Sequence, residues 1–348
     1  MTASQPYAGY LFVSFAGEDT PDGEQVRFAL SRGDDPLSYV DLAGNEPVLT
    51  WSAGRGGIRD PFVVRSPRDG RFFMIATDLK IYGTGDWDAA QRTGSRSIVV
   101  WESDDLVDWT PPRSVQVAPS NAGDAWAPEA CWDEEHDEFF VFWASTLYDA
   151  DDPAHERPSY HRMLCATTRD FVSFSEARVW SDPGHSVIDS TVVAHDGWWY
   201  RFTKDEREPS SSTPTSKFIT VERSRDLRSD SYEPVTDGVG RAGAHGPGIE
   251  QGEGPVVVRS NAGDRWYLFI DEFGGRGYVP FESADLDASQ WTMAHDARMP
   301  TGARHGSVLP VTRAEHAALL QAWGPGDAGC ADSLSDLSDD PADDLREA

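Results

Sequence analysis

The chain has 348 residues, of which 39% are hydrophobic, so it is long enough to bury a substantial core. It carries 59 acidic and 30 basic residues, a formal net charge of −29. This charge argues against a nucleic-acid or anionic-membrane partner, because both need clusters of Lys and Arg, and it is compatible with a neutral ligand such as a carbohydrate.

The cysteines and the N-terminal segment indicate the compartment. Cys131, Cys165 and Cys330 are too few, and odd in number, for a disulfide framework. The first basic residue is Arg27, and no apolar segment of leader-peptide length precedes it. No apolar run approaches the length of a transmembrane helix. We therefore expect a cytoplasmic protein.

The first elements in the chain are expected to be strands. Residues 1–8 form a short lead-in, and YLFVSF at 10–15 and VRFALS at 26–31 are rich in β-favouring residues. GIRDPFVVRSPRDGRFFMIATD at 57–78 contains two further apolar runs separated by Pro, Asp and Gly, which are turn residues. This stretch therefore predicts two strands joined by a tight turn.

The same pattern returns along the chain. RDPFVV, which starts at residue 59, is followed by WAPEAC at 126, IDSTVV at 188, EGPVVV at 253 and, more loosely, HGSVLP at 305. The first four are followed by a turn and an aromatic-rich run: RFFMIA, EFFVFWA, WWYRFT and RWYLFI. Aligned strands at this spacing are typical of a β-propeller, and the count predicts an all-β protein with five blades.

A second repeated segment follows an apolar run in each blade. SDDLVDWT at 103–110, TRDFVSFS at 168–175, SRDLRSDSYEPV at 224–235 and SADLDASQW at 283–291 combine a hydroxyl residue, an Asp and an aromatic. SRGDDPLSYVDL near the N-terminus has the same character. The acidic residues of these segments are expected to close turns; they are Asp104, Asp105, Asp170, Asp226 and Asp285.

The fifth blade lacks strands at its C-terminal end. After VLPVT the chain reads TRAEHAALLQAW, which predicts a short helix with a capping box between Thr312 and Glu315 and a stop at Gly324. The two N-terminal strands would then complete this blade, closing the ring and removing the sheet edges. The catalytic propeller domain is expected at 9–325, and 326–348 is expected to be an acidic, disordered tail.

Three longer loops interrupt the blades, at 81–97, 148–160 and 205–216. We expect them to be surface loops, which in a propeller can also build the rim of a pocket.

The first strand of each blade lines the axis of a propeller, so the residues at these strand starts should converge. They include the carboxylates Asp60, Asp189 and Glu253, together with His305. Three acidic groups in one cleft repel one another, and their pKa values separate. Such a set suits chemistry that needs a carboxylate and a carboxylic acid at the same pH, as glycoside hydrolysis does.

The motifs GIRDPFVV, WAPEA, SVIDSTVV, GEGPVVV and RHGSVLP, in this order and at blade spacing, resemble glycoside hydrolase family 43, the five-bladed furanosidases and xylosidases. The resemblance covers nearly all of residues 9–323. It implies that Asp60 is the general base that activates water and that Glu253 is the general acid. Asp189 would raise the pKa of that acid and orient it. The family inverts configuration, which implies a base–acid separation of about 6.5–9.5 Å.

The resemblance also suggests roles for three neighbours of the carboxylates. His305 matches a residue near an axial calcium or sodium ion, often through water; a hydrogen-bonded structural His is the alternative. Arg304 resembles a residue that contacts sugar hydroxyls, and Trp126 would wall the pocket. No cofactor is implied for the chemistry itself. The remaining tryptophans considered are expected to pack in the core or between blades; they are Trp87, Trp143, Trp198 and Trp199.

The substrate class is expected to be a small furanoside or pentoside, α-L-arabinofuranoside first and β-D-xyloside next, with galactofuranosides and arabinan still open. A fructan hydrolase or transferase is an alternative, but its WMNDPNG-type motif and Glu-Cys pair are absent. A non-catalytic, glycan-binding propeller is another, although it would be expected to lack one of the three carboxylates. For Arg59 the sequence leaves three environments open: the substrate, a neighbouring carboxylate or the blade interior.

Overall fold

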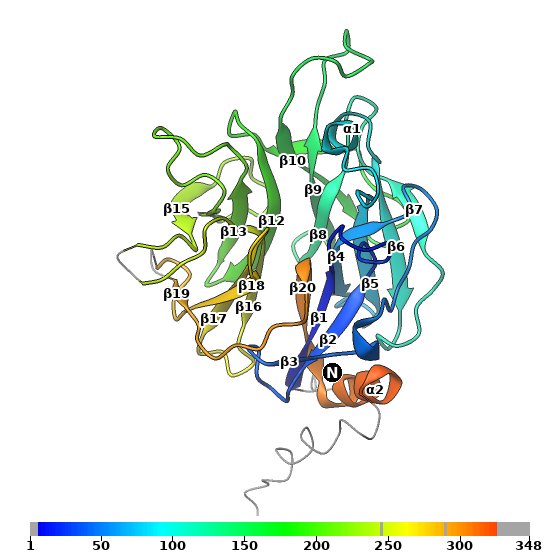
Figure 1. Cartoon of the computed structure of the whole chain (residues 1–348), viewed down its shortest axis with the longest axis vertical. Helices are drawn as coiled ribbons and strands as arrows, with labels where there is room; N and C mark the ends of the chain where they lie inside the picture. Colours follow the sequence, from blue (N-terminus) through cyan, green and yellow to red (C-terminus); the bar gives the residue numbers. More distant parts are fainter. Residues whose placement is uncertain (1–5, 244–245, 289–290, 326–348) are drawn as a thin grey trace, which may run out of the picture.

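The computed structural model describes residues 6–243, 246–288 and 291–325, so the predicted tail at 326–348 and Cys330 lie outside the described residues. Within these ranges, five four-stranded antiparallel sheets surround a common axis (Figure 1). The five-bladed β-propeller predicted from the repeat is confirmed. None of the helices in these ranges is both long and apolar enough to cross a membrane.

Each blade runs from an inner strand to an outer one. The first four blades consist of β4 (Ile58–Arg65), β5 (Phe72–Asp78), β6 (Ser97–Ser103) and β7 (Arg113–Gln116); β8 (Trp126–Asp133), β9 (Glu138–Thr146), β10 (His161–Thr168) and β11 (Arg178–Ser181); β12 (Val187–His195), β13 (Trp198–Asp205), β14 (Ile219–Ser224) and β15 (Glu233–Val239); and β16 (Glu253–Arg259), β17 (Trp266–Glu272), β18 (Gly277–Ser283) and β19 (Thr292–Met293).

The fifth blade joins the two ends of the chain, as predicted. Its strands, in order, are β20 (Arg304–Thr312), β1 (Tyr7–Phe15), β2 (Arg27–Ser31) and β3 (Tyr39–Asp41), which leads to the short 3₁₀ helix η1 (Ala43–Asn45). The innermost strand is therefore the last strand of the chain, paired antiparallel with the first. This pairing closes the ring and leaves neither terminal strand with a free edge on that side.

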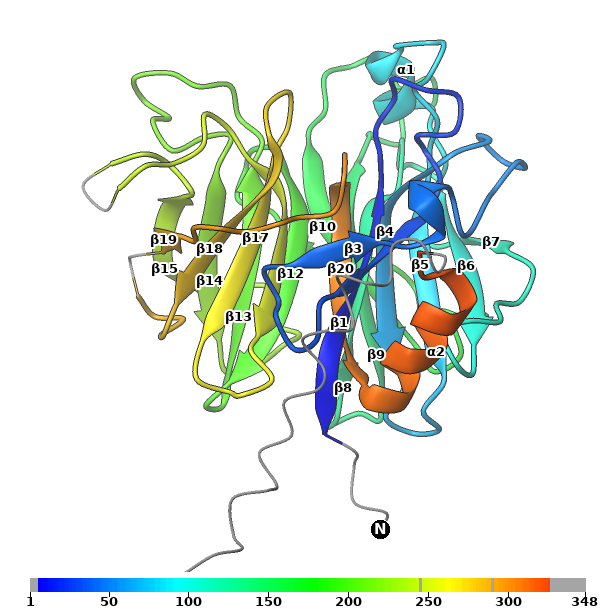
Figure 2. The same cartoon turned by 60° about the horizontal axis from the view of Figure 1, so that its bottom comes forward.

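Helix α2 (Arg313–Trp323) packs on the outside of the fifth blade, against β1 and β2 (Figure 2). The Thr312 side chain accepts a hydrogen bond from the Glu315 backbone N–H, and the Glu315 side chain accepts one from the Thr312 backbone N–H. The predicted capping box is thus confirmed. Near the end of the helix, Trp323 packs edge-on against Phe28, with ring centroids 5.5 Å apart.

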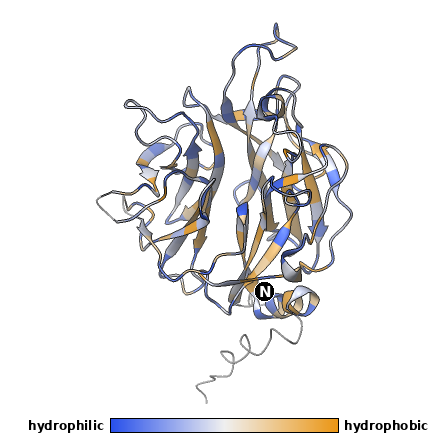
Figure 3. Ribbon diagram, in the orientation of Figure 1, coloured by the Kyte–Doolittle hydropathy of each residue, from blue (hydrophilic) through white to orange (hydrophobic). Residues whose placement is uncertain are grey.

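The hydrophobic core lies between neighbouring blades, and Figure 3 shows the apolar residues concentrated on the strands. All seven residues of β5 are buried, because its two faces pack against different neighbours. Phe73, Phe139 and Phe171 form one aromatic contact between the first and second blades. Trp143 is fully buried there, as predicted for a packing residue.

The repeated Asp residues close turns at the outer strands. In two blades the side chain accepts bonds from two backbone N–H groups, Asp105 from Val107 and Asp108, and Asp170 from Val172 and Ser173. Asp226 and Asp285 each accept one such bond from the residue two positions on. The predicted structural role of these four residues is confirmed, and that of Asp104 stays a prediction.

The segment 81–97 was expected to be a loop, but it contains a short helix, α1 (Trp87–Arg92). Asp86 accepts a hydrogen bond from the Ala89 backbone N–H and so caps the helix at its N-terminus. The helix has fewer than two turns, so a sequence pattern of apolar periodicity could not reveal it.

Candidate active site

The same irregularity occurs near the start of the inner strand in the first four blades. A register shift interrupts the pairing of β4, β8, β12 and β16 with their neighbours. The residues at this bulge have left-handed backbone conformations; they are Asp60 (φ 52°), Ala127 (φ 46°), Asp189 (φ 54°) and Gly254 (φ 52°). A bulge re-aims a side chain, and Gly and Asp tolerate this conformation better than most residues. The bulge therefore places Asp60 and Asp189 at equivalent positions.

The fifth blade requires one correction to the predicted alignment. Arg304 pairs with Phe15 and Ser307 with Val13, so Arg304 corresponds to Arg59 and His305 to Asp60. The match of HGSVLP to RDPFVV was therefore one residue out of register. Gly306 explains the shift, because a Cβ atom there would lie 1.9 Å from the Val13 carbonyl oxygen, and glycine is required by this close approach.

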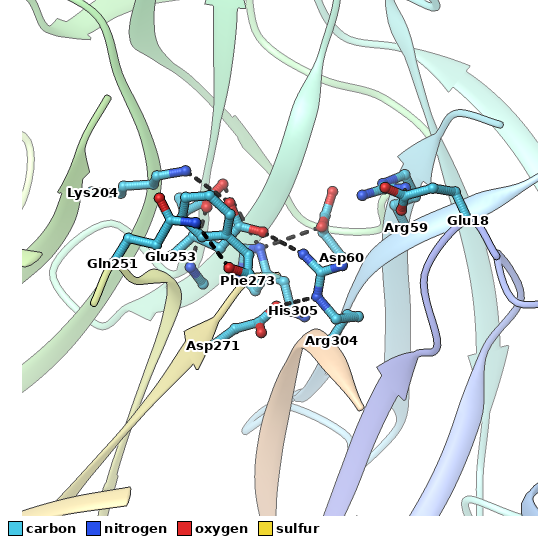
Figure 4. Close-up of polar contacts among 12 residues, drawn as sticks. Glu18, Arg59, Asp60, Lys204, Gln251, Glu253, Asp271, Phe273, Arg304 and His305 are labelled. Atoms are coloured by element: carbon cyan, nitrogen blue, oxygen red, sulfur yellow. Dashed lines mark hydrogen bonds and ion pairs between the residues drawn. The ribbon is translucent and has the colours of Figure 1, made fainter. Parts of the chain in front are cut away.

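His305 lies close to two of the predicted catalytic carboxylates. Its Nδ1 is 3.3 Å from Asp60 Oδ1, a contact seen in Figure 4, and 3.7 Å from Asp189 Oδ1. Asp60 also accepts a hydrogen bond from the Thr77 hydroxyl at 2.8 Å, and Asp189 accepts one from the Gly254 backbone N–H at 3.1 Å. The imidazole thus joins blades one, three and five at the axis.

The charges of this group follow from burial and from one another. Burial would lower the pKa of His305, but the Asp189 and Asp60 carboxylates outweigh it and raise the pKa to about 10. Burial would raise the pKa of Asp60, but the hydrogen bond and charge of His305 hold it below its usual value. Asp60 is therefore an ionised carboxylate beside an imidazolium, which is the state that a general base requires.

Asp189 behaves differently from Asp60. Burial raises its pKa to about 6, and the neighbouring Glu253 carboxylate adds to this effect, against the opposing charge of His305. The two equivalent aspartates therefore differ in proton affinity, as expected of acidic groups gathered in one cleft.

Glu253 is held by two cations. Its Oε2 lies 2.7 Å from Lys204 Nζ, and its Oε1 lies 2.8 Å from Arg304 Nη2. Arg304 also pairs through Nε with Asp271 at 2.7 Å. Figure 4 shows these side chains converging from β13, β16, β17 and β20. The Glu253 side chain keeps 18% of its surface exposed, so solvent can reach it.

These cations decide the protonation of Glu253. Burial alone would raise its pKa, but Lys204 and Arg304 outweigh burial and lower the pKa to about 2. In this arrangement Glu253 is an ionised carboxylate. A general acid needs a proton, so proton uptake has to accompany a weakening of this pairing.

The position of Glu253, one residue before the bulge, also has a structural reason. Gly254 occupies the bulge position itself, and a Cβ atom there would lie 2.6 Å from His305 Cγ. The His305 ring fills the space that a side chain at 254 would need. The carboxylate of the fourth blade therefore comes from the preceding residue.

Arg59 pairs with neighbouring carboxylates, which answers the question that the sequence left open. Its Nη1 lies 2.9 Å from Glu18 Oε2 and 3.0 Å from Glu24 Oε1, and its guanidinium stacks over the rings of Phe15 and Trp87. The residue is buried. Arg59 therefore connects the N-terminal segment of the fifth blade to the first.

Two tryptophans lie near Arg59: Trp87 packs against its guanidinium, and Trp126 packs against Trp87. Trp126 stacks on His161 with ring centroids 4.8 Å apart, and it meets Trp87 edge-on at 6.1 Å. Trp87 was predicted to pack in the core, but 37% of its surface is exposed, because it lies on the short helix α1 above the strand ends. Trp126 is partly exposed, so its role as a pocket wall stays a prediction.

Sequence reasoning missed Lys204 and Asp271, although the repeat carried a signal for them. The aromatic-rich second strands align so that Thr77, Ala144, Lys204 and Asp271 share one position. This position directly follows the runs RFFMIA, WWYRFT and RWYLFI and is the last residue of the run EFFVFWA. In the sheets these residues pair with the residue before the bulge, as Thr77 does with Arg59 and Asp271 with Glu253. Extending the alignment by one residue would have found them.

The calcium or sodium ion predicted near His305 stays a prediction. In the structure His305 Nδ1 faces the Asp60 carboxylate at 3.3 Å, and the carboxylates of Asp189 and Asp60 raise the pKa of His305. No group of three or more His, Cys, Asp or Glu side chains in the described ranges is arranged to hold a metal. The imidazolium itself places positive charge between Asp60 and Asp189.

Comparison with known proteins gives a family and a relative. The family model described as "Probable glycosyl hydrolase domain", related to glycosyl hydrolase family 43, matches residues 5–317. An α-L-arabinofuranosidase of Bifidobacterium longum subsp. longum is 33% identical over 325 residues, which cover 86% of this chain. The match covers only 30% of the length of that relative.

Two solved structures share the fold. An exo-β-1,3-galactanase from Clostridium thermocellum superposes with a TM-score of 0.53 at 13% identity, covering 82% of this chain and 59% of the other. An exo-β-1,3-galactanase from Phanerochaete chrysosporium does so with a TM-score of 0.50 at 12% identity, covering 84% and 64%. At this identity the likeness concerns the propeller architecture alone.

Proposed function

The chain belongs to a glycoside hydrolase family related to family 43, and on this basis we propose that it is an inverting glycosidase that acts on small furanosides or pentosides. α-L-Arabinofuranosides are the first substrates to test, because the curated relative is an α-L-arabinofuranosidase; β-D-xylosides come next. Because the chain matches less than a third of that relative, the sugar is part of the proposal.

The observation that carries the proposal is the convergence of Asp60 and Glu253, held in different environments at the same end of the inner strands. Asp60 is kept ionised by His305 at 3.3 Å. Glu253 remains partly exposed and pairs with Arg304, the residue before His305. The backbone N–H of Gly254, the residue after Glu253, donates a hydrogen bond to Asp189. In the proposed reaction Asp60 takes a proton, and Glu253, once protonated, gives one.

The proposed reaction assigns one proton to each of these residues. Protonated Glu253 donates its proton to the glycosidic oxygen as the bond from that oxygen to the anomeric carbon breaks. Asp60 takes a proton from a water molecule, whose oxygen forms the new bond to the anomeric carbon from the opposite face. His305 contacts both Asp60 and Asp189, and Asp189 accepts a hydrogen bond from the backbone N–H of Gly254, next to Glu253. These contacts hold the two reacting carboxyl groups in position. The product therefore has inverted configuration.

The first test is a screen of aryl α-L-arabinofuranosides, β-D-xylosides and β-D-galactofuranosides with the purified chain and its Glu253→Gln variant. The proposal predicts turnover of at least one of these classes. The variant should lose about 10²–10⁴-fold on poor leaving groups, which need protonation, and less on activated ones. Turnover of poor leaving groups at the normal rate by Glu253→Gln would remove this residue from the acid role.

A further inference from the structure

Lys204 occupies an unusual place in this site. Its side chain is only 3% exposed, and its Nζ lies 2.7 Å from Glu253 Oε2 and 2.7 Å from Glu206 Oε2. It extends from β13 in the third blade to a carboxylate of the fourth. A buried ammonium is stable only when it is paired, and both partners here are carboxylates.

The choice of lysine is itself informative. The chain has 30 basic residues, and only Lys80, Lys204 and Lys217 are lysines. Two of the three belong to this network, since Lys217 Nζ lies 2.8 Å from Glu206 Oε1. Arginine binds a carboxylate through a rigid fork, whereas lysine carries a compact charge on a flexible stem that can be divided between partners.

Each of the two cations that pair with Glu253 has a second carboxylate partner, and the two partners differ in burial. Arg304 is shared with the buried Asp271, which is opposite Glu253 in the β16–β17 pair. Lys204 is shared with Glu206, which is 27% exposed and lies on the solvent side of the network. A small movement of the ammonium toward Glu206 therefore weakens its hold on Glu253 while keeping it paired.

We propose that Lys204 is a positioning residue for proton donation: it holds the Glu253 carboxylate in place and controls its proton uptake by dividing its charge between Glu253 and Glu206. This inference rests on the acid role proposed for Glu253. In each turnover Glu253 takes one proton from water and passes it to the leaving oxygen. Lys204 keeps its own protons, because Glu253 and Glu206 raise its pKa despite burial.

All charged groups that face Glu253 enter the expected pH dependence. Lys204, Arg304 and His305 favour its ionised form, and Lys204 and Arg304 contribute most. Asp189 and Asp271 are acidic neighbours whose own pKa values Glu253 raises. Because Lys204 touches Glu253 directly and has a second partner, its removal should change the proton affinity of Glu253 without unpairing Arg304.

The test compares Lys204→Met with Lys217→Met, a matched control that removes the same charge from the other side of Glu206. The carboxyl carbon of Glu253, labelled with ¹³C and assigned by its loss in Glu253→Gln, is titrated by NMR in each protein. Removal of Lys204 should raise the pKa of Glu253 by about one unit or more, whereas Lys217→Met should leave it within a few tenths. An unchanged pKa of Glu253 in Lys204→Met would overturn the inference.

A second variant should shift the pKa of Glu253 in the opposite direction. Glu206→Gln removes the alternative partner of Lys204, so the pKa of Glu253 should fall below its value in the unmodified protein. The limb of the pH profile of kcat/KM that reports Glu253, identified by its loss in Glu253→Gln, should move with it: up in Lys204→Met and down in Glu206→Gln. Limbs that stay fixed in both variants would also overturn the inference.

The NMR titration keeps this inference separate from the proposed function. If no glycoside is turned over, the proposed function fails, yet the titration still shows whether Lys204 sets the protonation of Glu253. If Lys204→Met unfolds, as its melting curve would show, Glu206→Gln alone decides the matter, because it leaves the buried ammonium paired with Glu253.

Discussion

The imidazole of His305 lies 3.3 Å from the carboxylate of Asp60, and its pKa is raised to about 10. An imidazolium therefore stands at the bulge position of the fifth blade, where Asp60 stands in the first. The fixed positive charge of His305 keeps Asp60 ionised in a buried place that would otherwise favour its protonated form.

Replacing His305 by Asn should impair the base. The amide keeps a donor near Asp60 but removes the charge, so the pKa of Asp60 should rise toward and above its usual value. The acidic limb of the kcat/KM profile should move to higher pH, and activity should fall most at low pH. An acidic limb that does not move would show that His305 leaves Asp60 unaffected.

The His305→Asn variant should also change how the stability of the protein depends on pH. The folded-state pKa of His305 lies above its unfolded value of about 6.5, so its ion pairs contribute fully below that pH and are lost as pH rises toward 10. The melting temperature of the unmodified protein should therefore fall more between pH 7 and 10 than that of His305→Asn. Parallel curves over this range would contradict a raised pKa.

Replacing Asp60 by Asn should abolish most activity while preserving the fold. Asn tolerates the left-handed backbone at this position (φ 52°) and can still bond to Thr77. We expect a loss of about 10²–10⁴-fold in kcat with little change in melting temperature. Asp105→Asn, in a turn at an outer strand, is the control and should keep full activity. An active Asp60→Asn protein would exclude Asp60 as the base.

Glu24 should be essential to stability rather than to chemistry. It is completely buried, it pairs with Arg59 at 3.0 Å, and it accepts hydrogen bonds from the backbone N–H groups of Ile81 and Tyr82. Glu24→Ala leaves Arg59 with only the more exposed Glu18 and should cost about 3–5 kcal/mol of the free energy of unfolding. Chemical denaturation measures this, with Glu18→Ala as a milder comparison. Equal, small losses in both variants would refute the structural role of Glu24.

Trp87 should contribute to substrate binding. Its exposed face stands beside Arg59 and Trp126, and an indole face suits stacking on a sugar ring. Trp87→Ala should raise KM several-fold with kcat and melting temperature little changed. Val172→Ala, at an exposed position on a turn of the second blade, is the control. An unchanged KM on every substrate turned over would assign Trp87 to surface packing alone.

The number of blades and the positions of the three carboxylates at the starts of inner strands could be predicted from the sequence. Both follow from a repeat whose bulge is encoded by local residues. Asp60 and Asp189 occupy that bulge, and Gly254 marks it in the fourth blade. The alignment of β20 was predicted one residue out of register, because this register depends on how closely Gly306 approaches Val13 in a strand 293 positions away.

The contacts between blades could not be predicted in the same way. Lys204 meets Glu253 across 49 positions, and Arg59 meets Glu24 across 35, only once neighbouring blades pack against one another. Trp87 was misplaced because tryptophan in a β protein is usually buried, whereas here it lies on a short helix above the strands. The repeat marks the position of Lys204, but which residue each of these side chains meets depends on how the blades pack against one another.

The most direct test of the account is the configuration of the first-formed product. Hydrolysis of the best substrate from the aryl glycoside screen is followed by ¹H NMR from the first minutes, before the free sugar equilibrates between anomers. A water activated by Asp60 opposite the proton donor Glu253 predicts a product of inverted anomeric configuration. An initial product that retains the substrate's configuration would contradict the assignment of these two residues.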